Sequence, residues 1–137
     1  MSKIARLKYL AVELLKDQLP GFRYEDTEET ISQKKAPMFT ISTDAGTEFE
    51  TSSYGTIRAT TNLKVDVFLC IGRDMNTDNN SDTDIIQDSI RKAIVNSQDL
   101  KHEFQEVICT KTMASNVPGE SGLRALFHDF EVSWLDV

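Results

Sequence analysis

The chain has 137 residues, of which 39% are hydrophobic, and a formal net charge of −7 at pH 7. This length fits a single domain, residues 1–137, that can bury its own core, and no apolar run approaches the ~20 residues of a membrane helix. The negative charge, with basic residues scattered along the chain, argues against direct binding to a nucleic-acid backbone.

The first predicted element is a helix over residues 3–18. Apolar residues recur there at helical spacing, Ser2 is a suitable N-cap, and the Pro-Gly pair at 20–21 ends the helix. Charged residues interrupt its apolar positions, so the segment is unlike a signal peptide, and we expect the chain to stay in the cytoplasm where it is made. Tyr9 and Val12 lie off the core stripe and are either ordinary surface residues or contacts with a neighbouring subunit.

A short strand is predicted next, between two polar stretches. The acidic run at 25–29 favours a solvated loop or the edge of a strand. Residues 36–43 predict a strand with Phe39 and Ile41 facing inward, because Pro is tolerated near the start of a strand. A turn signal at 44–46 follows this strand.

The most regular pattern in the sequence covers residues 57–71. Every odd position there is apolar or, once, Thr. The even positions are polar from Arg58 to Asp66, and Phe68 is the first apolar residue among them. Successive strand side chains point to opposite faces, so this pattern predicts a strand with one buried and one mostly wet face. Such a strand would span about 50 Å at ~3.3 Å per residue, and we expect one end to project beyond the core. The polar stretch before it, 47–56, carries Phe49 and Tyr54 and predicts a hairpin extension or a mobile loop.

A polar loop at 73–83 offers the best candidate for a metal site. Its acidic and amide residues alternate like the oxygen ligands of a calcium loop, at Asp74, Asn76, Asp78, Asn80 and Asp82. The glycine of such loops is replaced by Asn79, and Ile85 stands where a bidentate Glu is needed. We therefore interpret the stretch as an ordinary polar loop with a helix cap at Ser81, Asp82 or Thr83, and we predict no metal and no cofactor.

The remaining predicted elements are a helix over 83–97, a strand over 104–111, a loop over 113–122 and a long strand over 123–137. His128 falls on the apolar face of the last strand and is interpreted as a residue of the core edge or of an interface. Cys70 and Cys109 each fall inside a predicted strand and are expected to be buried thiols.

The predicted order of elements is therefore α-β-β-β-α-β-β. Strands that follow each other at hairpin distance imply a mainly antiparallel sheet, and the two amphipathic helices would pack on one face of it. The expected fold class is α+β with two layers. The sequence contains no nucleophile elbow, P-loop, zinc-protease motif or dinucleotide fingerprint, so it indicates no enzymatic activity.

This layout resembles the tail terminator (tail completion, or minor tail protein U-like) proteins of long-tailed bacteriophages. The resemblance covers nearly the full length. It includes the N-terminal helix closed by Leu-Pro-Gly at 19–21, the apolar strand after Ala36-Pro37, the strand 63–71 after a long loop, and the final strand ending FEVSWLDV. The 73–83 loop has no counterpart in that pattern.

The resemblance implies a structural virion protein rather than an enzyme. Such proteins form a ring, usually a hexamer, at the head-proximal end of the tail, where the ring stops polymerisation of the tail tube protein and presents a docking surface to the head connector. The implied partners are other copies of the chain, the tail tube protein and the head connector or completion protein, with no membrane and no sequence-specific nucleic acid.

Six residues are candidates for contacts with a neighbouring subunit or partner because they fall off the core stripes or on the wet face of the long strand. They are Tyr9, Val12, Phe49, Tyr54, Arg58 and Phe68. Two other functions remain open at this point. The chain could be another phage head-tail connector or neck protein, or a small cytoplasmic ligand-binding or enzymatic α+β domain.

Overall fold

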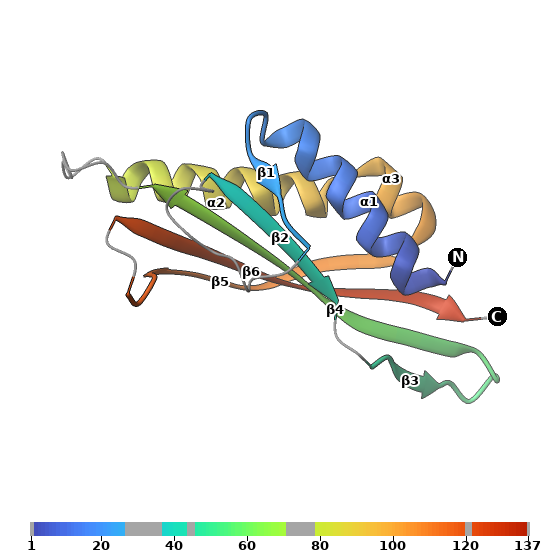
Figure 1. Cartoon of the computed structure of the whole chain (residues 1–137). Helices are drawn as coiled ribbons and strands as arrows, with labels where there is room; N and C mark the ends of the chain where they lie inside the picture. The colour runs from blue at the N-terminus through green and yellow to red at the C-terminus, as the bar shows by residue number, and fades with distance from the viewer. Residues whose placement is uncertain (1, 27–36, 44–45, 71–78, 120–121, 137) are drawn as a thin grey trace.

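In the part of the chain that the structure describes, three helices cover one face of a six-stranded sheet (Figure 1). The structure is a computed structural model that describes residues 2–26, 37–43, 46–70, 79–119 and 122–136, with side chains in the second helix described from residue 83. Its elements are α1 (Lys3–Gln18), β1 (Arg23–Tyr24), β2 (Met38–Thr43), β3 (Glu48–Thr51), β4 (Ile57–Cys70), α2 (Asn79–Val95), α3 (Gln98–Glu103), β5 (Glu106–Asn116) and β6 (Leu123–Asp136). The predicted α+β class with helices on one face is confirmed.

Two strands of 14 residues, β4 and β6, form the centre of the sheet. They pair antiparallel along their whole length, from Ile57 opposite Asp136 to Cys70 opposite Leu123. The strand order is β1-β2-β4-β6-β5, and only β1 and β2 run parallel. Two strands pair with the edge of β4 that does not face β6. Strand β2 pairs with the second half of β4, and β3 pairs with the first four residues of β4.

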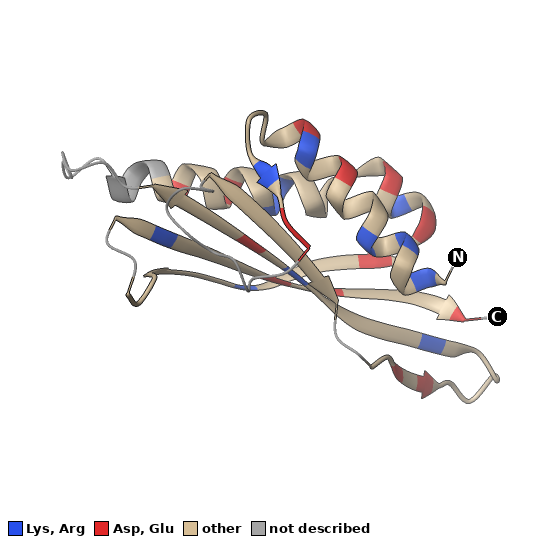
Figure 2. Cartoon of the chain, viewed as in Figure 1, with Lys and Arg blue, Asp and Glu red and all other residues tan. Residues whose placement is uncertain are grey.

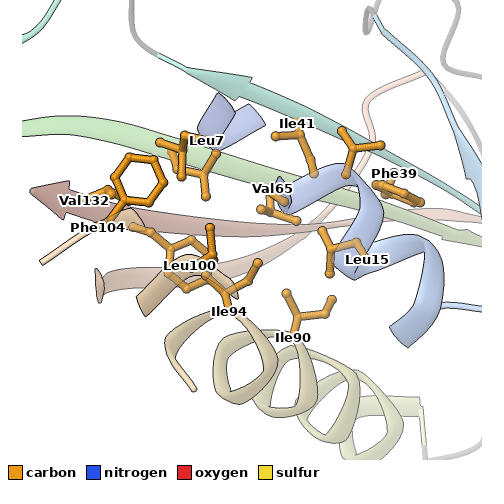
Figure 3. Packing of buried hydrophobic residues seen from close by; sticks show 14 of the residues in the cluster. Leu7, Leu15, Phe39, Ile41, Val65, Ile90, Ile94, Leu100, Phe104 and Val132 are labelled. Atoms are coloured by element: carbon orange, nitrogen blue, oxygen red, sulfur yellow. The ribbon is translucent and has the colours of Figure 1, made fainter. Parts of the chain in front are cut away.

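The predicted alternation of β4 is confirmed, and it determines where the core lies. Its odd residues Leu63, Val65 and Val67 are fully buried under the helices. Their partners on β6 share that face, as Phe130 does opposite Leu63. The main core cluster joins these strand residues to Leu7 and Leu15 of α1, Ile90 and Ile94 of α2, and Leu100 and Phe104 around α3 (Figure 3).

Helix α1 has the predicted bounds and the predicted cap. The Ser2 hydroxyl accepts a hydrogen bond from the backbone N–H of Ala5 at 3.1 Å. Beyond the helix, Gly21 adopts a φ of +85°, which glycine reaches at no steric cost. The interpretation of Val12 as a surface residue is wrong. It is buried because α1 packs against α2 as well as β2, and its apolar stripe is therefore wider than a sheet alone would require.

The second helical region differs from the prediction of one helix over 83–97. Helix α2 already begins at Asn79, so the predicted caps at 81–83 lie inside it, and it ends at Val95. Ser97 has an extended backbone, with ψ of 123°, and caps the separate helix α3 by accepting a hydrogen bond from Leu100 N–H at 3.2 Å. A serine side chain that hydrogen-bonds a nearby backbone N–H competes with the backbone hydrogen bonds that would continue a helix. This competition explains why α2 and α3 are separate helices.

The edge strand β5 is longer than predicted. It continues to Asn116, whereas a loop was expected from residue 113. A bulge between Cys109 and Lys111 shifts the alternation by one residue, so the second half no longer matches the pattern of the first. Pairing with β6 holds this mostly exposed segment in the sheet. The two-residue strand β1, which pairs with β2, was not predicted as a separate strand.

A second, smaller cluster lies on the face of the sheet turned away from the helices. It consists of Met38, Phe68, Leu123 and Ala125, with Val117 and Phe127 packed against it. The even positions of β4 are therefore not all exposed, because Asp66 and Phe68 are buried. Phe68, predicted to be available to a partner, is buried in this cluster.

Candidate interaction surface

The start of β4 and the strand before it form a hairpin that we call the arm, residues 46–60. All four residues of β3 are exposed, and β3 lies beside β4 away from the three helices (Figure 1). Two large aromatic side chains stand on the arm. Phe49 is 62% exposed and Tyr54 is 96% exposed. The prediction of a hairpin extension at 47–56 is confirmed.

A hydrogen-bonded turn closes the arm and carries Tyr54. The Ser52 N–H donates to the Thr56 carbonyl oxygen at 2.8 Å, and the Gly55 N–H donates to the Ser52 carbonyl oxygen at 3.0 Å. The Ser52 hydroxyl accepts from the N–H groups of Tyr54 and Thr56. Gly55 has a φ of +81°, a conformation that a side chain would strain. The exposure of Tyr54 therefore comes from a defined turn.

The arm is acidic on the face opposite the helices. Glu48 and Glu50 lie across from Thr60 and Arg58, and neither carboxylate forms an ion pair with any residue that the structure describes. Arg58 lies on the same face, where its guanidinium lies 3.5 Å from the Glu106 carboxylate of β5 and donates to the Ser133 hydroxyl of β6 at 3.0 Å. Together with Glu131, the two arm glutamates line an open hollow of about 640 Å³.

The first half of α1 has the opposite charge. Lys3, Arg6 and Lys8 lie there with no acidic residue before Glu13, as Figure 2 shows in blue along the start of the helix. Glu103 of α3 contacts two of these basic side chains, Lys3 and Arg6. It accepts from Lys3 Nζ through its backbone oxygen at 2.8 Å, and its carboxylate pairs with Arg6 Nε at 2.7 Å.

An exposed aromatic ring lies beside these basic residues. Tyr9 is 49% exposed, and the Arg6 guanidinium lies over its ring at 5.5 Å from the centroid. Lys8 forms no hydrogen bond or ion pair with the described part of the chain. The outer face of α1 thus combines an aromatic ring with an unpaired cation.

The six predicted interface residues separate into two groups. Tyr9, Phe49 and Tyr54 are exposed, and the Arg58 side chain is partly exposed. Val12 and Phe68 are buried within the chain, so their side chains are not available to a partner in this structure. The acidic pair on β3 and Lys8 on α1 were not singled out from the sequence. Their local charge signs, acidic at 48–50 and basic at 3–8, were the available signal.

His128 was interpreted as a residue of the core edge or of an interface, but it lies deeper in the protein than that. It is fully buried opposite Val65, and its Nδ1 lies 3.0 Å from the Val65 carbonyl oxygen. Nδ1 therefore carries the proton that it donates, and buried Nε2 has no partner among the described residues. Burial lowers the pKa of His128, so the ring is neutral.

The two cysteines are more accessible than expected. Cys70 is exposed at the end of β4, and Cys109 is partly buried. Burial raises the pKa of the Cys109 thiol. The prediction of two buried thiols is wrong because Cys70, at the end of β4, lies on the face of the sheet turned away from the helices, and because Cys109 lies on the edge strand β5.

The proposed calcium-like loop lies mostly outside the described residues, as do the side chains of Asn80 and Asp82. Within the described part of the chain, no group of three or more His, Cys, Asp or Glu side chains converges to hold a metal ion. None of the described helices is long and apolar enough to cross a lipid bilayer.

Comparisons with known proteins add no assignment. No protein-family model matches the chain, and a search of curated proteins finds no match.

Proposed function

We propose that the chain is a structural phage virion protein that forms a ring at the head-proximal end of the tail tube. In this role the ring stops polymerisation of the tube and provides the surface on which the head docks. The resemblance of the sequence layout to tail terminators supports the proposal. The observation that carries it is the arm, an exposed hairpin that presents Phe49 and Tyr54 to solvent.

Exposed aromatic side chains on a projecting hairpin are typical of a contact surface. Tyr and Phe bury large areas at interfaces with little loss of side-chain entropy, and such anchors dominate binding energy. A contact between two different surfaces of identical subunits generates a ring when the rotation between neighbours closes, and an open filament when it does not. A subunit of 137 residues with a distinct arm has the parts that a closed ring requires.

The charge of the chain agrees with the proposed position. DNA passes through the lumen of such a ring, and a wall with net negative charge does not hold a phosphate backbone. The chain carries 22 acidic and 15 basic residues. The open face of the sheet bears acidic residues of β6, Asp129 and Glu131, as well as those of the arm.

The test measures assembly and capping. Native mass spectrometry and negative-stain microscopy of the purified protein should show a ring of fixed copy number, and addition of the protein to a polymerising cognate tail tube protein should yield short, capped tubes. A protein that stays monomeric at every concentration and leaves tube length unchanged would contradict the proposal. Binding to a portal-side ring without any effect on tubes would instead favour another head-tail connector.

A further inference from the structure

We propose that the arm of one copy docks on the outer face of α1 of the next copy, with Glu48 and Glu50 facing Lys8 and with Tyr54 against Tyr9. This inference deepens the proposed ring and rests on it for the identity of the partner, which is a second copy of this chain. It assigns the two surfaces that meet and predicts that they differ from each other.

Charge complementarity identifies the partner. The arm has two carboxylates without an ion pair in the described structure, and its one basic residue, Arg58, is paired with Glu106. The first half of α1 has three basic residues and no acidic residue in its first turn. The helix dipole also places partial positive charge at that end, so acidic groups near the start of α1 are stabilised. Glu103 of α3 already contacts Lys3 and Arg6 there, which leaves Lys8 as the cation without an ion pair or hydrogen bond in the described part of the chain.

The exposed aromatic rings occur at the same two places. Tyr54 lies at the turn of the arm, close in sequence to the carboxylates, whereas Phe49 faces the opposite side of β3 from Glu48 and Glu50. Tyr9 accompanies the basic residues of α1. All three rings remain exposed within one chain, so the arm does not satisfy the α1 surface of its own chain. Contact between copies would bury aromatic area and pair opposite charges in one step.

The size of the surfaces predicts a contact that is weak in isolation. Each aromatic side chain can bury about 150–250 Å², so Tyr9 and Tyr54 supply only part of the roughly 1,600 Å² of a stable pairwise interface. Closing a ring makes the last contact intramolecular, and the assembled ring is then much more stable than a single pair. Arm and α1 are different surfaces, so the association is head-to-tail.

The decisive experiment uses two variants with different defects. The arm variant is Glu48→Lys with Glu50→Lys, and the helix variant is Lys8→Glu with Tyr9→Ala. Lys111→Glu, on the exposed edge strand β5, repeats the Lys-to-Glu charge change at a site away from both surfaces. Analytical ultracentrifugation measures self-association, and circular dichroism checks that each variant is folded, since the substituted side chains are exposed or partly exposed.

We expect each of the two variants to weaken self-association by at least about tenfold, and Lys111→Glu to leave it unchanged. An equimolar mixture of the two defective variants should recover association, because the intact arm of the helix variant can meet the intact α1 of the arm variant and the reversed charges of the two substituted surfaces also attract each other. Wild-type association should weaken as salt is raised.

Three results would overturn the inference. These are wild-type-like assembly of both variants, a mixture that stays monomeric, or a wild-type assembly that stops at two copies. The failure of the proposed function is distinguishable from this. A ring that depends on both surfaces but never caps tubes contradicts the tail role alone, whereas capping by rings that ignore these substitutions contradicts the docking alone.

Discussion

At the scale of single residues, the sharpest electrostatic feature is a histidine buried in an apolar core. His128 donates one hydrogen bond to a backbone carbonyl through Nδ1 and leaves Nε2 without a described partner. A charged imidazolium there would lose its hydration and gain no second acceptor, which is why its pKa is lowered, with the nearby Asp129 only partly opposing that effect.

This arrangement predicts a pH-dependent stability. Below the ordinary histidine pKa of about 6.5, the unfolded chain takes up a proton on His128 that the folded chain does not bind. Stability should therefore fall as pH decreases below about 6.5, by up to about 1.4 kcal/mol per pH unit from this group. Urea unfolding at pH 7.5, 6.5 and 5.5 measures the slope. His128→Leu should flatten it in this range, and substitution of exposed His102 to Gln should not.

A second prediction at this scale compares two phenylalanines. Phe104 is buried, and its ring meets that of Trp134 edge-on with centroids 5.7 Å apart. Phe104→Ala should reduce the free energy of unfolding by about 3–5 kcal/mol, because it removes buried area and leaves a cavity. Phe49→Ala, on the exposed arm, should change it by less than about 0.5 kcal/mol in the monomer. Equal losses for the two variants in urea denaturation would show that the arm is packed against the core.

At the scale of elements, local backbone chemistry explains the starts and ends of the helices, and strand pairing explains the edges of the sheet. Ser2 and Ser97 cap α1 and α3 through the same hydrogen bond to an N–H three residues later. Strand β5 lacks a regular alternation of buried and exposed residues after its bulge. It remains part of the sheet because β6 pairs with it along its length. The arm depends on a short turn and on the pairing of β3 with β4.

The arm turn gives a prediction with a matched control. Gly55 has a positive φ, so Gly55→Ala should destabilise the hairpin by about 1–2 kcal/mol. Gly46→Ala lies at the base of the same arm, where an added Cβ meets nothing within 4 Å and φ is not positive, and should have little effect. Hydrogen exchange of the arm amides should accelerate in the first variant only. Protection unchanged by Gly55→Ala would mean that the turn does not hold the arm.

At the scale of the whole molecule, the helices cover one face of the sheet, while the arm extends past them and the other face is only partly covered by a small cluster. Such a subunit offers distinct surfaces for neighbours. If assembly occurs as proposed, the native state is stabilised by mass action, because copies bind the folded chain and not the unfolded one.

The midpoint of thermal unfolding should therefore rise with protein concentration. Scanning calorimetry at about 5 and 200 μM should show an increase of a few degrees for the wild type. The arm variant Glu48→Lys with Glu50→Lys should show a smaller increase, with the same midpoint as the wild type at the low concentration. A midpoint independent of concentration for the wild type would argue against self-association in this range.

The sequence by itself determined the long strands and their buried faces. The alternation in β4 and β6 is a local property with a period of two, and a one-residue shift would expose every apolar side chain on one face. Helix α1 could be predicted equally well from the sequence, because its apolar stripe, its N-cap and the Pro-Gly pair that ends it all lie within 20 contiguous residues. The exposed aromatic residues of the arm were also identified in this way.

Tertiary structure alone decided the features that depend on neighbours distant in sequence. Val12 is buried because α2 lies against α1, and Phe68 is buried because residues of β2 and β6 meet it on the open face. Strand β5 extends because β6 pairs with it, and Cys70 is exposed because it is at the end of β4. The meeting of charge and aromatic residues on the arm and on α1 likewise depends on which side chains the packing leaves free, and local sequence patterns carry no information about that.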